Sequence, residues 1–273
     1  MSPKTIAFLG ATGGCTNACL AHTLKAGYHA IALARTPSKL TSLLLQQDGI
    51  TEEILASQLR IVRGDAMDVA SIKKTILLSG SNEGGSLVDI IVSGIGGTPS
   101  LNMDMRKCLF VPTVKLDNPH ITEKTASALV SALQEIYSER KLNNHDQDKP
   151  VLACISTTGL TDDNEPPDVP FLMRAMYHTL LAEPHKDKRK MEAVIDANRD
   201  LFAGTVIVRP TLLTGDGKST AGKKKGRQKL RVGTARKPAL GYTVDRADVG
   251  EWIFEEVIKT GGKRWFGEKV TLA

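Results

Sequence analysis

The sequence has 273 residues, of which 41% are hydrophobic and 24% charged, the balance of an ordinary globular protein with enough chain to bury a core. Aromatic residues make up only 4%, which argues against a stacking surface for single-stranded nucleic acid. The formal net charge of +6 is local, because residues 216–238 carry six Lys and three Arg against one Asp.

The sequence predicts neither a metal site nor a membrane span. The cysteines Cys15, Cys19, Cys108 and Cys154 form no CxxC pair and no cluster with histidine, so we assign no metal ligands and expect no disulfide framework. The apolar run at 6–9 is too short for a secretion signal, and no run is long enough to span a membrane. We therefore expect a cytoplasmic protein.

The first part of the chain alternates apolar runs with segments of helical periodicity. Strands are predicted at 4–10, 29–35, 59–65 and 88–97, and helices at 15–27, 38–47 and 69–80. The strands are continuously apolar, which is typical of a parallel sheet covered by helices on both faces.

The second part continues this alternation with longer helices. Residues 99–120 are expected to be irregular, followed by a helix at 121–142, a strand at 151–156, helical residues 171–201 broken near Pro184, a strand at 205–210 and a helix at 244–259 that begins at Asp245 or Asp248. The predicted fold class is α/β, a doubly wound parallel sheet with a small C-terminal elaboration that covers the substrate. Residues 1–273 form a single domain, with a core at 1–210 and a covering segment plus final helix at 211–273.

The stretch GATGGCTNAC at residues 10–19 lies between the first strand and the first helix. Glycines in such a turn let backbone N–H groups approach a pyrophosphate at the positive end of the helix dipole. The third glycine of the usual pattern is replaced by Thr16, which either moves the helix outward, caps it or offers its hydroxyl to a phosphate. A tight turn without a ligand is the alternative. The residues assigned to cofactor binding here are Gly10, Thr12, Gly13, Gly14, Cys15 and Thr16.

The end of the second strand distinguishes NAD from NADP. An acidic residue there would bind the ribose hydroxyls of NAD, whereas this chain has Arg35, followed by Ser38 and Lys39. A guanidinium suits the 2′-phosphate of NADP. We therefore predict NADP(H), with a solvated strand end as the alternative for Arg35.

The ends of the third and fourth strands complete the predicted cofactor site. Asp65 either lies beside the adenine amino group or caps the helix that follows. The small residues at 93–97 mark the point where the ribose and nicotinamide would pass. The further residues assigned to the cofactor are Ala66, Ser93, Gly94, Ile95 and Pro210.

The motifs resemble those of the atypical short-chain dehydrogenase/reductases, most of all the NmrA-like and NAD(P)H-binding branch that includes flavin and biliverdin-IXβ reductases. The matching segments are GATGG at 10–14, LARTPSKL at 33–40, GDAMD at 64–68, ISTTGL at 155–160, PHKDKRKME at 184–192, VIVRPTLLTGDG at 206–217 and DRADVGEWI at 245–253. The resemblance implies a Rossmann sheet and NADP(H). It does not identify a substrate, and some members of the family are redox sensors.

The resemblance also implies a catalytic Ser after the fifth strand and a Tyr-x-x-x-Lys downstream. Ser156 matches the Ser and Lys188 the Lys, but Pro184 stands in the tyrosine position. His185 lies on the same helical face as Lys188 and could donate the proton instead, as could Lys188 itself or a water held by Ser156. Alternatively His185 only packs against a loop and Lys188 only pairs with Glu192.

Two other tyrosines were considered for the missing acid. Tyr137 begins a Tyr-x-x-x-Lys stretch at 137–141, but this stretch precedes the fifth strand and is interpreted as a chance match. Tyr177 lies in the same helical region as His185 and is the weaker candidate.

The basic stretch at 216–238 is interpreted as a lid over an anionic substrate rather than as a nucleic-acid patch, since no aromatic residues are interleaved with the cations. We expect a small-molecule substrate, no nucleic-acid or membrane partner, and leave the oligomeric state open. The function predicted first is NADPH-dependent reduction of a small carbonyl, quinone or conjugated acceptor. The alternatives are a non-catalytic NADP sensor that binds a protein partner and an isomerase or cyclase with a structural dinucleotide.

Overall fold

A computed structural model describes residues 4–78, 86–97, 99–102, 113–140, 149–161, 164–218 and 230–273. The strands are β1 (Thr5–Leu9), β2 (His29–Ala34), β3 (Leu59–Arg63), β4 (Ile90–Ser93), β5 (Pro99–Asn102), β6 (Thr113–Leu116), β7 (Val151–Ile155), β8 (Gly204–Pro210), β9 (Leu212–Thr214), β10 (Val232–Thr234), β11 (Thr243–Asp245) and β12 (Lys269–Leu272). The α-helices are α1 (Gly14–Lys25), α2 (Pro37–Leu44), α3 (Glu52–Gln58), α4 (Val69–Ile76), α5 (Ile121–Arg140), α6 (Phe171–Leu180), α7 (Ala182–Asp196) and α8 (Arg246–Ile253). A π-helical extension, Phe254–Lys259, continues α8, and short 3-10 turns lie at Arg199–Leu201 and Lys263–Trp265.

The central sheet has the order β10-β12-β8-β7-β4-β1-β2-β3. Every pair in it is parallel except β10 with β12. The chain runs outward from β1 to β3 in one direction and then returns to place β4 on the other side of β1. This reversal opens a crevice beyond the carboxyl ends of β1 and β4, which is where ligands bind in sheets of this kind.

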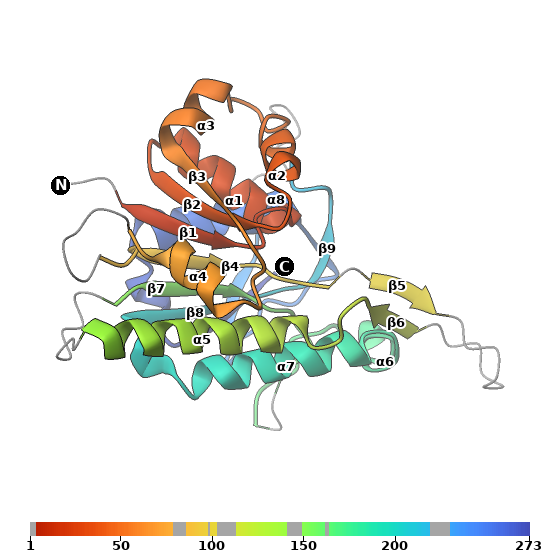
Figure 1. The fold of residues 1–273 in the computed structure, drawn as a ribbon. Helices are drawn as coiled ribbons and strands as arrows, with labels where there is room; N and C mark the ends of the chain where they lie inside the picture. Colours follow the sequence, from red (N-terminus) through yellow and green to blue (C-terminus); the bar gives the residue numbers. More distant parts are fainter. Residues whose placement is uncertain are drawn as a thin grey trace.

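Helices cover both faces of the sheet, which confirms the predicted Rossmann-like α/β class. Figure 1 shows α4, α5 and α7 layered along one face and α1 with α8 on the other. Alternate residues of one strand face the two layers: Phe8 packs with α1 and α8, whereas Ala7 and Leu9 pack with α4, α5 and α7. Burial on both faces is the reason the strands are continuously apolar.

Some elements differ from the prediction. The predicted irregular region contains the antiparallel hairpin β5–β6, and the helix α3 and the strands β9, β10, β11 and β12 were not predicted. The break in residues 171–201 falls at Leu181 instead of Pro184. Pro184 lies within the first turn of α7, where its missing N–H has no helical acceptor to lose.

The C-terminal part of the chain belongs to the sheet as well as to the crevice. Strands β12 and β10 extend the sheet beyond β8, and α8 packs its buried face on α1. Gly250 permits this contact, because a Cβ there would lie 2.6 Å from the Cβ of Ala18. Residues after 210 thus contribute two strands to this sheet, and the expected division into a core at 1–210 and a covering segment at 211–273 stays a prediction.

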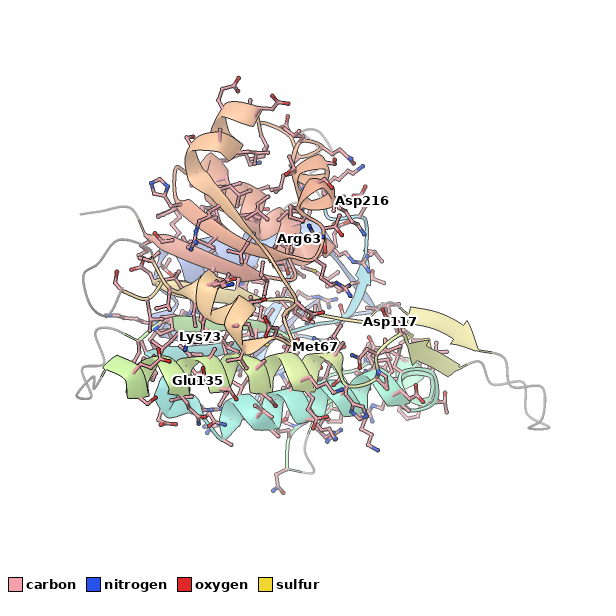
Figure 2. The ribbon with its side chains drawn as sticks, viewed as in Figure 1. Arg63, Met67, Lys73, Asp117, Glu135 and Asp216 are labelled. Atoms are coloured by element: carbon pink, nitrogen blue, oxygen red, sulfur yellow. The ribbon has the colours of Figure 1, made fainter. Side chains whose placement is uncertain are left out.

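The helix starts follow from local side-chain caps. Thr51 accepts a hydrogen bond from the N–H of Ile54 at the start of α3, and Asp245 accepts one from Ala247 at the start of α8. At the surface, Lys73 of α4 points toward Glu135 of α5, at 3.2 Å (Figure 2). Of the helices that the structure describes, none combines the length and the apolar character that a membrane crossing requires.

Candidate functional site

The glycine loop turns at Gly10, whose φ of +82° suits glycine and whose missing Cβ leaves room for the backbone of Gly94 at 2.8 Å. The N–H of Gly13 donates to the carbonyl of Gly10 at 2.9 Å and closes the turn. Gly13 also precedes α1 and offers no side-chain cap. The first N–H groups of α1, which have no intrahelical acceptor, therefore face the cavity described below and can bind an anion.

Thr16 lies in the first turn of α1, is 1% exposed and does not cap the helix. Its side chain fills the space beside Gly94, where a Cβ would collide with the Thr16 hydroxyl and lie 3.0 Å from Ile155 Cδ1. The side chain at Thr16, where the usual pattern has glycine, is thus accommodated by the missing side chain at Gly94, which follows β4. The helix keeps its close approach to β4, and the expected capping by Thr16 is wrong.

Two cations stand at the end of β2. Arg35 and Lys39 are exposed and line the cavity, and no acidic partner within ion-pair distance is recorded for either one among the described residues. Ser38 is exposed on α2 and lies outside the lining. A cationic rim without carboxylates suits a phosphate better than a pair of ribose hydroxyls.

Asp65 does not cap α4, so that alternative is wrong. The cap is Asp68, whose carboxylate accepts from the N–H of Ser71 at 2.9 Å. Asp65 instead accepts from the N–H of Met67 at 2.9 Å and lines the cavity beside Ala66. The other interpretation, a contact of the Asp65 carboxylate with adenine, stays a prediction.

One cavity of about 440 Å³ joins these loops. The sequence-predicted residues that line it are Gly10, Thr12, Gly13, Gly14, Cys15, Thr16, Arg35, Lys39, Asp65, Ala66, Gly94, Ile95, Ser156 and Lys188. Those outside its lining are Ser38, Ser93, Pro210 and His185. The side chain of Ser93 forms a hydrogen bond with the buried thiol of Cys154. The carbonyl oxygen of Pro210 accepts a hydrogen bond from the N–H of Thr158 at 3.0 Å.

Lys188 reaches from α7 to the carboxyl ends of two strands. Its Nζ donates to the carbonyl oxygens of Ile95 at 3.0 Å and Ile155 at 2.7 Å. Burial lowers its pKa, because the ammonium has lost much of its hydration. It does not form the expected ion pair with Glu192. Its third contact is a longer one, to Met191 Sδ at 3.9 Å. A thioether sulfur is a weak acceptor, so an oxygen in the cavity that Lys188 lines can take this donor instead.

Ser156 donates its hydroxyl to Glu192 at 2.5 Å, and both side chains are buried. Glu192 is also held by Arg209 at 2.6 Å and by Lys269 at 3.3 Å. Both oxygens of Glu192 thus accept hydrogen bonds, Oε1 from Ser156 and Arg209 and Oε2 from Arg209. The single proton of Ser156 is therefore committed to Glu192, and what the hydroxyl offers to the cavity is a hydrogen-bond acceptor.

His185 packs away from the cavity. Its ring centroid lies 5.5 Å from that of Tyr177, and both rings contact Gly159, which has a φ of +84°. Tyr177 is 4% exposed, and its burial raises its pKa despite hydrogen bonding with Thr158 and Leu212. The structure brings Ser156 and Lys188 together and leaves His185 and Tyr177 behind them, in the packed arrangement foreseen as the alternative for His185.

Tyr137 has a structural role toward the end of α5, whose start lines the cavity at Ile121 and Thr125. Its hydroxyl donates to the carbonyl of Leu201 at 2.9 Å, and its ring packs with the core between α5 and the sheet. Lys141, the second half of the apparent motif, lies outside the described residues. Residues 219–229 of the basic stretch at 216–238 also lie outside them, so its predicted role as a lid stays a prediction.

Sequence reasoning missed several residues of the lining, of which Arg246 carries the most chemistry. The others are small or apolar: Leu33, Ala34, Gly64, Ile121, Thr125, Ile155 and Leu213. Gly96 and Gly97, which also line the cavity, belong to the segment 93–97 that was expected to border the cofactor. Arg246 follows the cap of α8, and its position next to Asp245 resembles a surface pair in the sequence. No local pattern places it beside a loop more than two hundred residues away.

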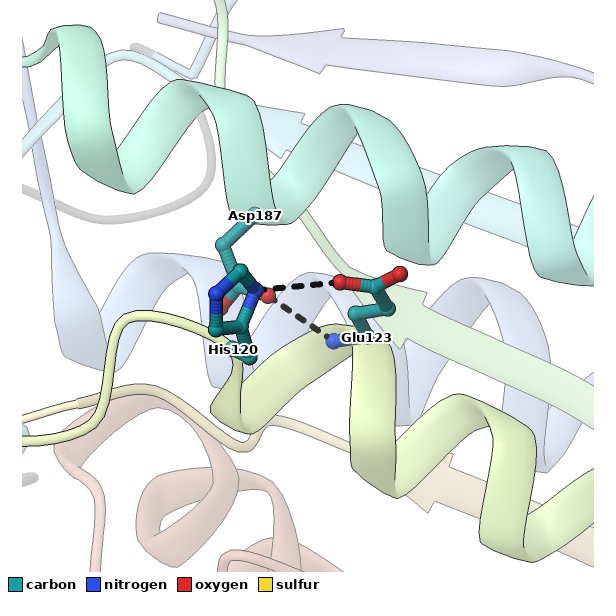
Figure 3. Close-up of side chains that lie close together, drawn as sticks. All are labelled: His120, Glu123 and Asp187. Carbon is teal, nitrogen blue, oxygen red and sulfur yellow. Dashed lines mark hydrogen bonds and ion pairs between the residues drawn. The ribbon is translucent and has the colours of Figure 1, made fainter.

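A second cluster of polar side chains lies between α5 and α7 (Figure 3). Ligand-type atoms of His120, Glu123 and Asp187 lie within 4.8 Å of one another. Each carboxylate already has a partner, because Asp187 accepts from the backbone N–H groups of Thr122 and Glu123 while Glu123 pairs with Lys190 at 3.0 Å. The cluster docks α7 on the start of α5.

Comparisons with known proteins agree with this geometry. Residues 10–259 match the sequence model of a family described as NAD(P)H-binding. The chain is 48% identical to the oxidase pynE of Aspergillus niger, with 100% of this chain and 99% of that protein covered. It is 41% identical to the reductase pytE of Aspergillus terreus, with 99% and 98% covered.

Solved structures share the fold at low identity. A short-chain dehydrogenase/reductase of Veillonella parvula, in complex with NADP, has a TM-score of 0.63 at 14% identity and covers 99% of this chain and 94% of its own. ChuY, an anaerobillin reductase from Escherichia coli O157:H7, has a TM-score of 0.60 at 15% identity, with 98% and 96% covered. The glycine loop, the cations at the end of β2 and the glycines at 94, 96 and 97 are compatible with a nicotinamide dinucleotide, the cofactor class of the matched family.

Proposed function

The chain belongs to the NAD(P)H-binding family matched by residues 10–259, and from this membership we propose that it is an NADPH-dependent reductase of a small carbonyl, quinone or conjugated acceptor. The family and the relatives named as oxidase and reductase make it an NAD(P)-dependent oxidoreductase. The observation that carries the finer proposal is the convergence of Lys188 and Ser156 on the cavity that contains the glycine loop.

The preference for NADPH rests on the rim at the end of β2. Arg35 and Lys39 line the cavity there, and a 2′-phosphate between them would find a guanidinium and an ammonium. The ribose hydroxyls of NADH would find no carboxylate on this strand end. The same rim therefore favours one cofactor and penalises the other.

The reaction end of the cleft, defined by Ser156 and Lys188, supplies a donor and an acceptor. The nicotinamide supplies a hydride when it is bound. Lys188 is placed to donate a hydrogen bond, or its proton, to the oxygen of an acceptor, and its lowered pKa makes proton release easier. Ser156 accepts a hydrogen bond from the substrate or from a water, because its own O–H donates to Glu192.

This division of labour takes the place of the absent tyrosine. Pro184 stands at the tyrosine position, and His185 lies outside the cavity lining. We therefore assign proton donation to Lys188 first and to a water bound at Ser156 second. The missing tyrosine is also what favours the second candidate function, an NADP sensor without turnover that binds a protein partner.

Turnover separates these two functions. Purified protein is mixed with NADPH and a panel of quinones, aldehydes, ketones and enones, and oxidation of NADPH is followed by absorbance. We expect steady oxidation with at least one acceptor and a kcat/KM that falls as pH rises through the lowered pKa of Lys188, because the neutral amine is a poorer donor. Binding of NADPH without oxidation by any of these acceptors would support the sensor instead.

The role of Lys188 is tested with a matched variant on the same helix. Lys188→Met should lower kcat and remove the high-pH decline, whereas Lys186→Met, at an exposed position outside the cavity lining, should change neither. Equal rates and equal pH profiles for Lys188→Met and the wild type would remove Lys188 from the proposal. Turnover of a substrate without net consumption of NADPH would point to an isomerase or cyclase.

A further inference from the structure

The strap, which we define as residues 214–218, lies directly on the glycine loop. A Cβ on Gly14 would lie 2.6 Å from Arg246 Cδ and 3.0 Å from the carbonyl oxygen of Asp216. Gly217 in turn meets the backbone of Gly14 so closely that a side chain there has no room. The side-chain amide of Gln47 holds this arrangement by donating to the carbonyl of Gly217 at 2.9 Å.

Arg246 is held over the loop by one hydrogen bond. Its Nη1 donates to the carbonyl of Gly215 at 2.6 Å, and its aliphatic stem rests on Gly14. A guanidinium has five N–H donors, so most of them are left for the cavity that Arg246 lines. Its nearness to the loop shows in Cys15, where burial raises the thiol pKa to about 12 and Arg246 is the largest opposing influence.

The neighbouring carboxylates are turned to other partners. Asp216, which lies at the end of β9 beside α2 (Figure 2), accepts from the N–H of Lys218 at 2.9 Å and pairs with its ammonium at 3.6 Å. Asp245 accepts from the N–H of Ala247. Over the described ranges of the chain, no ion pair of Arg246 with a carboxylate is recorded, so its charge is available to a ligand.

The position of this charge matches one part of a dinucleotide. The glycine loop itself contributes backbone N–H groups and a helix dipole but contains no Lys or Arg. The other cations of the lining lie at its two ends, with Arg35 and Lys39 at the end of β2 and Lys188 at the reaction end. Between them, at Gly13 and Gly14, the pyrophosphate requires compensation of two negative charges.

We propose that Arg246 binds the pyrophosphate of the dinucleotide, closing over it from the side opposite the glycine loop. The planar guanidinium is suited to two phosphate oxygens at once. The strap makes this binding depend on Gly14 and Gly217, which must lack side chains for Arg246 to reach. The inference rests on dinucleotide binding, which the family membership shows, and does not depend on the proposed reduction.

The test compares ligands with and without a pyrophosphate by titration calorimetry. The probes are NADP⁺ and ADP-ribose, which contain it, and 2′-AMP, which does not. Arg246→Gln should weaken NADP⁺ and ADP-ribose by about tenfold or more, the loss expected for a charge-assisted contact, and leave 2′-AMP within about twofold. Arg246→Lys should recover part of the loss, since it restores the charge without the fork.

Lys218→Gln is the matched control, because it removes a cation from the same strap at a position outside the cavity lining. It should bind all three probes like the wild type. If Arg246 only fastens the strap, Arg246→Gln will lower the melting temperature of the free protein and weaken all three probes alike, and the proposal is wrong. Unchanged NADP⁺ affinity in Arg246→Gln also overturns it. Failure to find an acceptor for NADPH would count against the reductase and not against this site.

Discussion

At the glycine-loop end of the cleft, residues 10–16 form the wall with their own backbone, whereas at the reaction end Ser156 and Lys188 are positioned by side chains from other elements. The first arrangement needs small residues and a sharp turn, which neighbours in sequence can supply. The second needs Glu192 on α7 and Arg209 on β8, brought together only by the fold. The shape of the glycine-loop end depends on residues that lack side chains. The geometry of the reaction end depends on a network of charged side chains. Variants can therefore be chosen that damage one end by adding atoms and the other by removing a charge.

The largest effect is expected at the reaction end, from Arg209→Met. Arg209 is 1% exposed and is paired with Glu192 at 2.6 Å, so its removal leaves a buried carboxylate that Lys269 compensates only in part. The free energy of unfolding should fall by about 3–5 kcal/mol in urea titrations. Ser156 should also lose the fixed position of its hydrogen-bond acceptor, because Arg209 no longer holds Glu192 in place.

The control for Arg209→Met is a surface pair of the same type. Lys73→Met breaks the contacts of Lys73 with Glu135 and Glu139, whose side chains are 53% and 63% exposed, and should cost less than about 1 kcal/mol. Similar losses for the two variants would mean that the network behind Ser156 is no more costly to break than solvated charges.

The next effect tests the glycine-loop end with Gly94→Ala. The new Cβ would collide with the Thr16 hydroxyl and should cost about 1–3 kcal/mol of unfolding free energy. In the background of Thr16→Gly the same change should cost at least about 1 kcal/mol less, because the clashing side chain is gone. The measurement is a double-mutant cycle in urea. Additive effects of the two substitutions would show that the cost of Gly94→Ala does not come from a clash with the Thr16 side chain.

The glycine-loop end of the cleft could be predicted from the sequence. The strands, the turn at Gly10 and the cations at Arg35 and Lys39 follow one another within a short stretch, and each type of residue has a local physical reason. Position in the turns after the strands then sufficed to predict 12 residues of one cavity lining, from Gly10 to Ile95. Thr16 was visible as an exception, but its compensation at Gly94 was not, since it depends on the register of β4 beside β1.

At the reaction end, the sequence predicted single residues but not how they contact one another. Ser156 and Lys188 were found through resemblance. The hydrogen bond from Ser156 depends on Glu192, which is held in place by Arg209 and Lys269 on strands far along the chain. One signal was available: an Arg within the apolar run VIVRP needs a buried carboxylate. Arg246 gave no such signal, because the start of a helix is an ordinary place for a solvated Arg.

The burial of Lys188 gives a smaller effect that depends on pH. Its pKa in the folded protein is below the ordinary 10.5, so between the two values the unfolded chain binds more protons and stability rises with pH. The wild type should therefore gain stability relative to Lys188→Met across that window, with a slope of at most about 1.4 kcal/mol per pH unit. Loss of the bonds to the Ile95 and Ile155 carbonyls shifts the whole curve and leaves its slope unchanged. Urea titrations between neutral pH and pH 10.5 measure the slope, and Lys186→Met should run parallel to the wild type.

The smallest effect is expected at Tyr137 and tests whether the Tyr-x-x-x-Lys stretch at 137–141 is a chance match. Tyr137→Phe removes one hydrogen bond to the Leu201 carbonyl and should cost about 0.5–1.5 kcal/mol of stability. NADP⁺ affinity and any rate of NADPH oxidation should stay at the wild-type value, because the ring lies in the core between α5 and the sheet and outside the cavity lining. A large loss of rate without loss of stability would restore the Tyr-x-x-x-Lys stretch as catalytic. The contrast with Lys188→Met then shows that placement at the carboxyl ends of β4 and β7, rather than spacing along the chain, decides which residue acts.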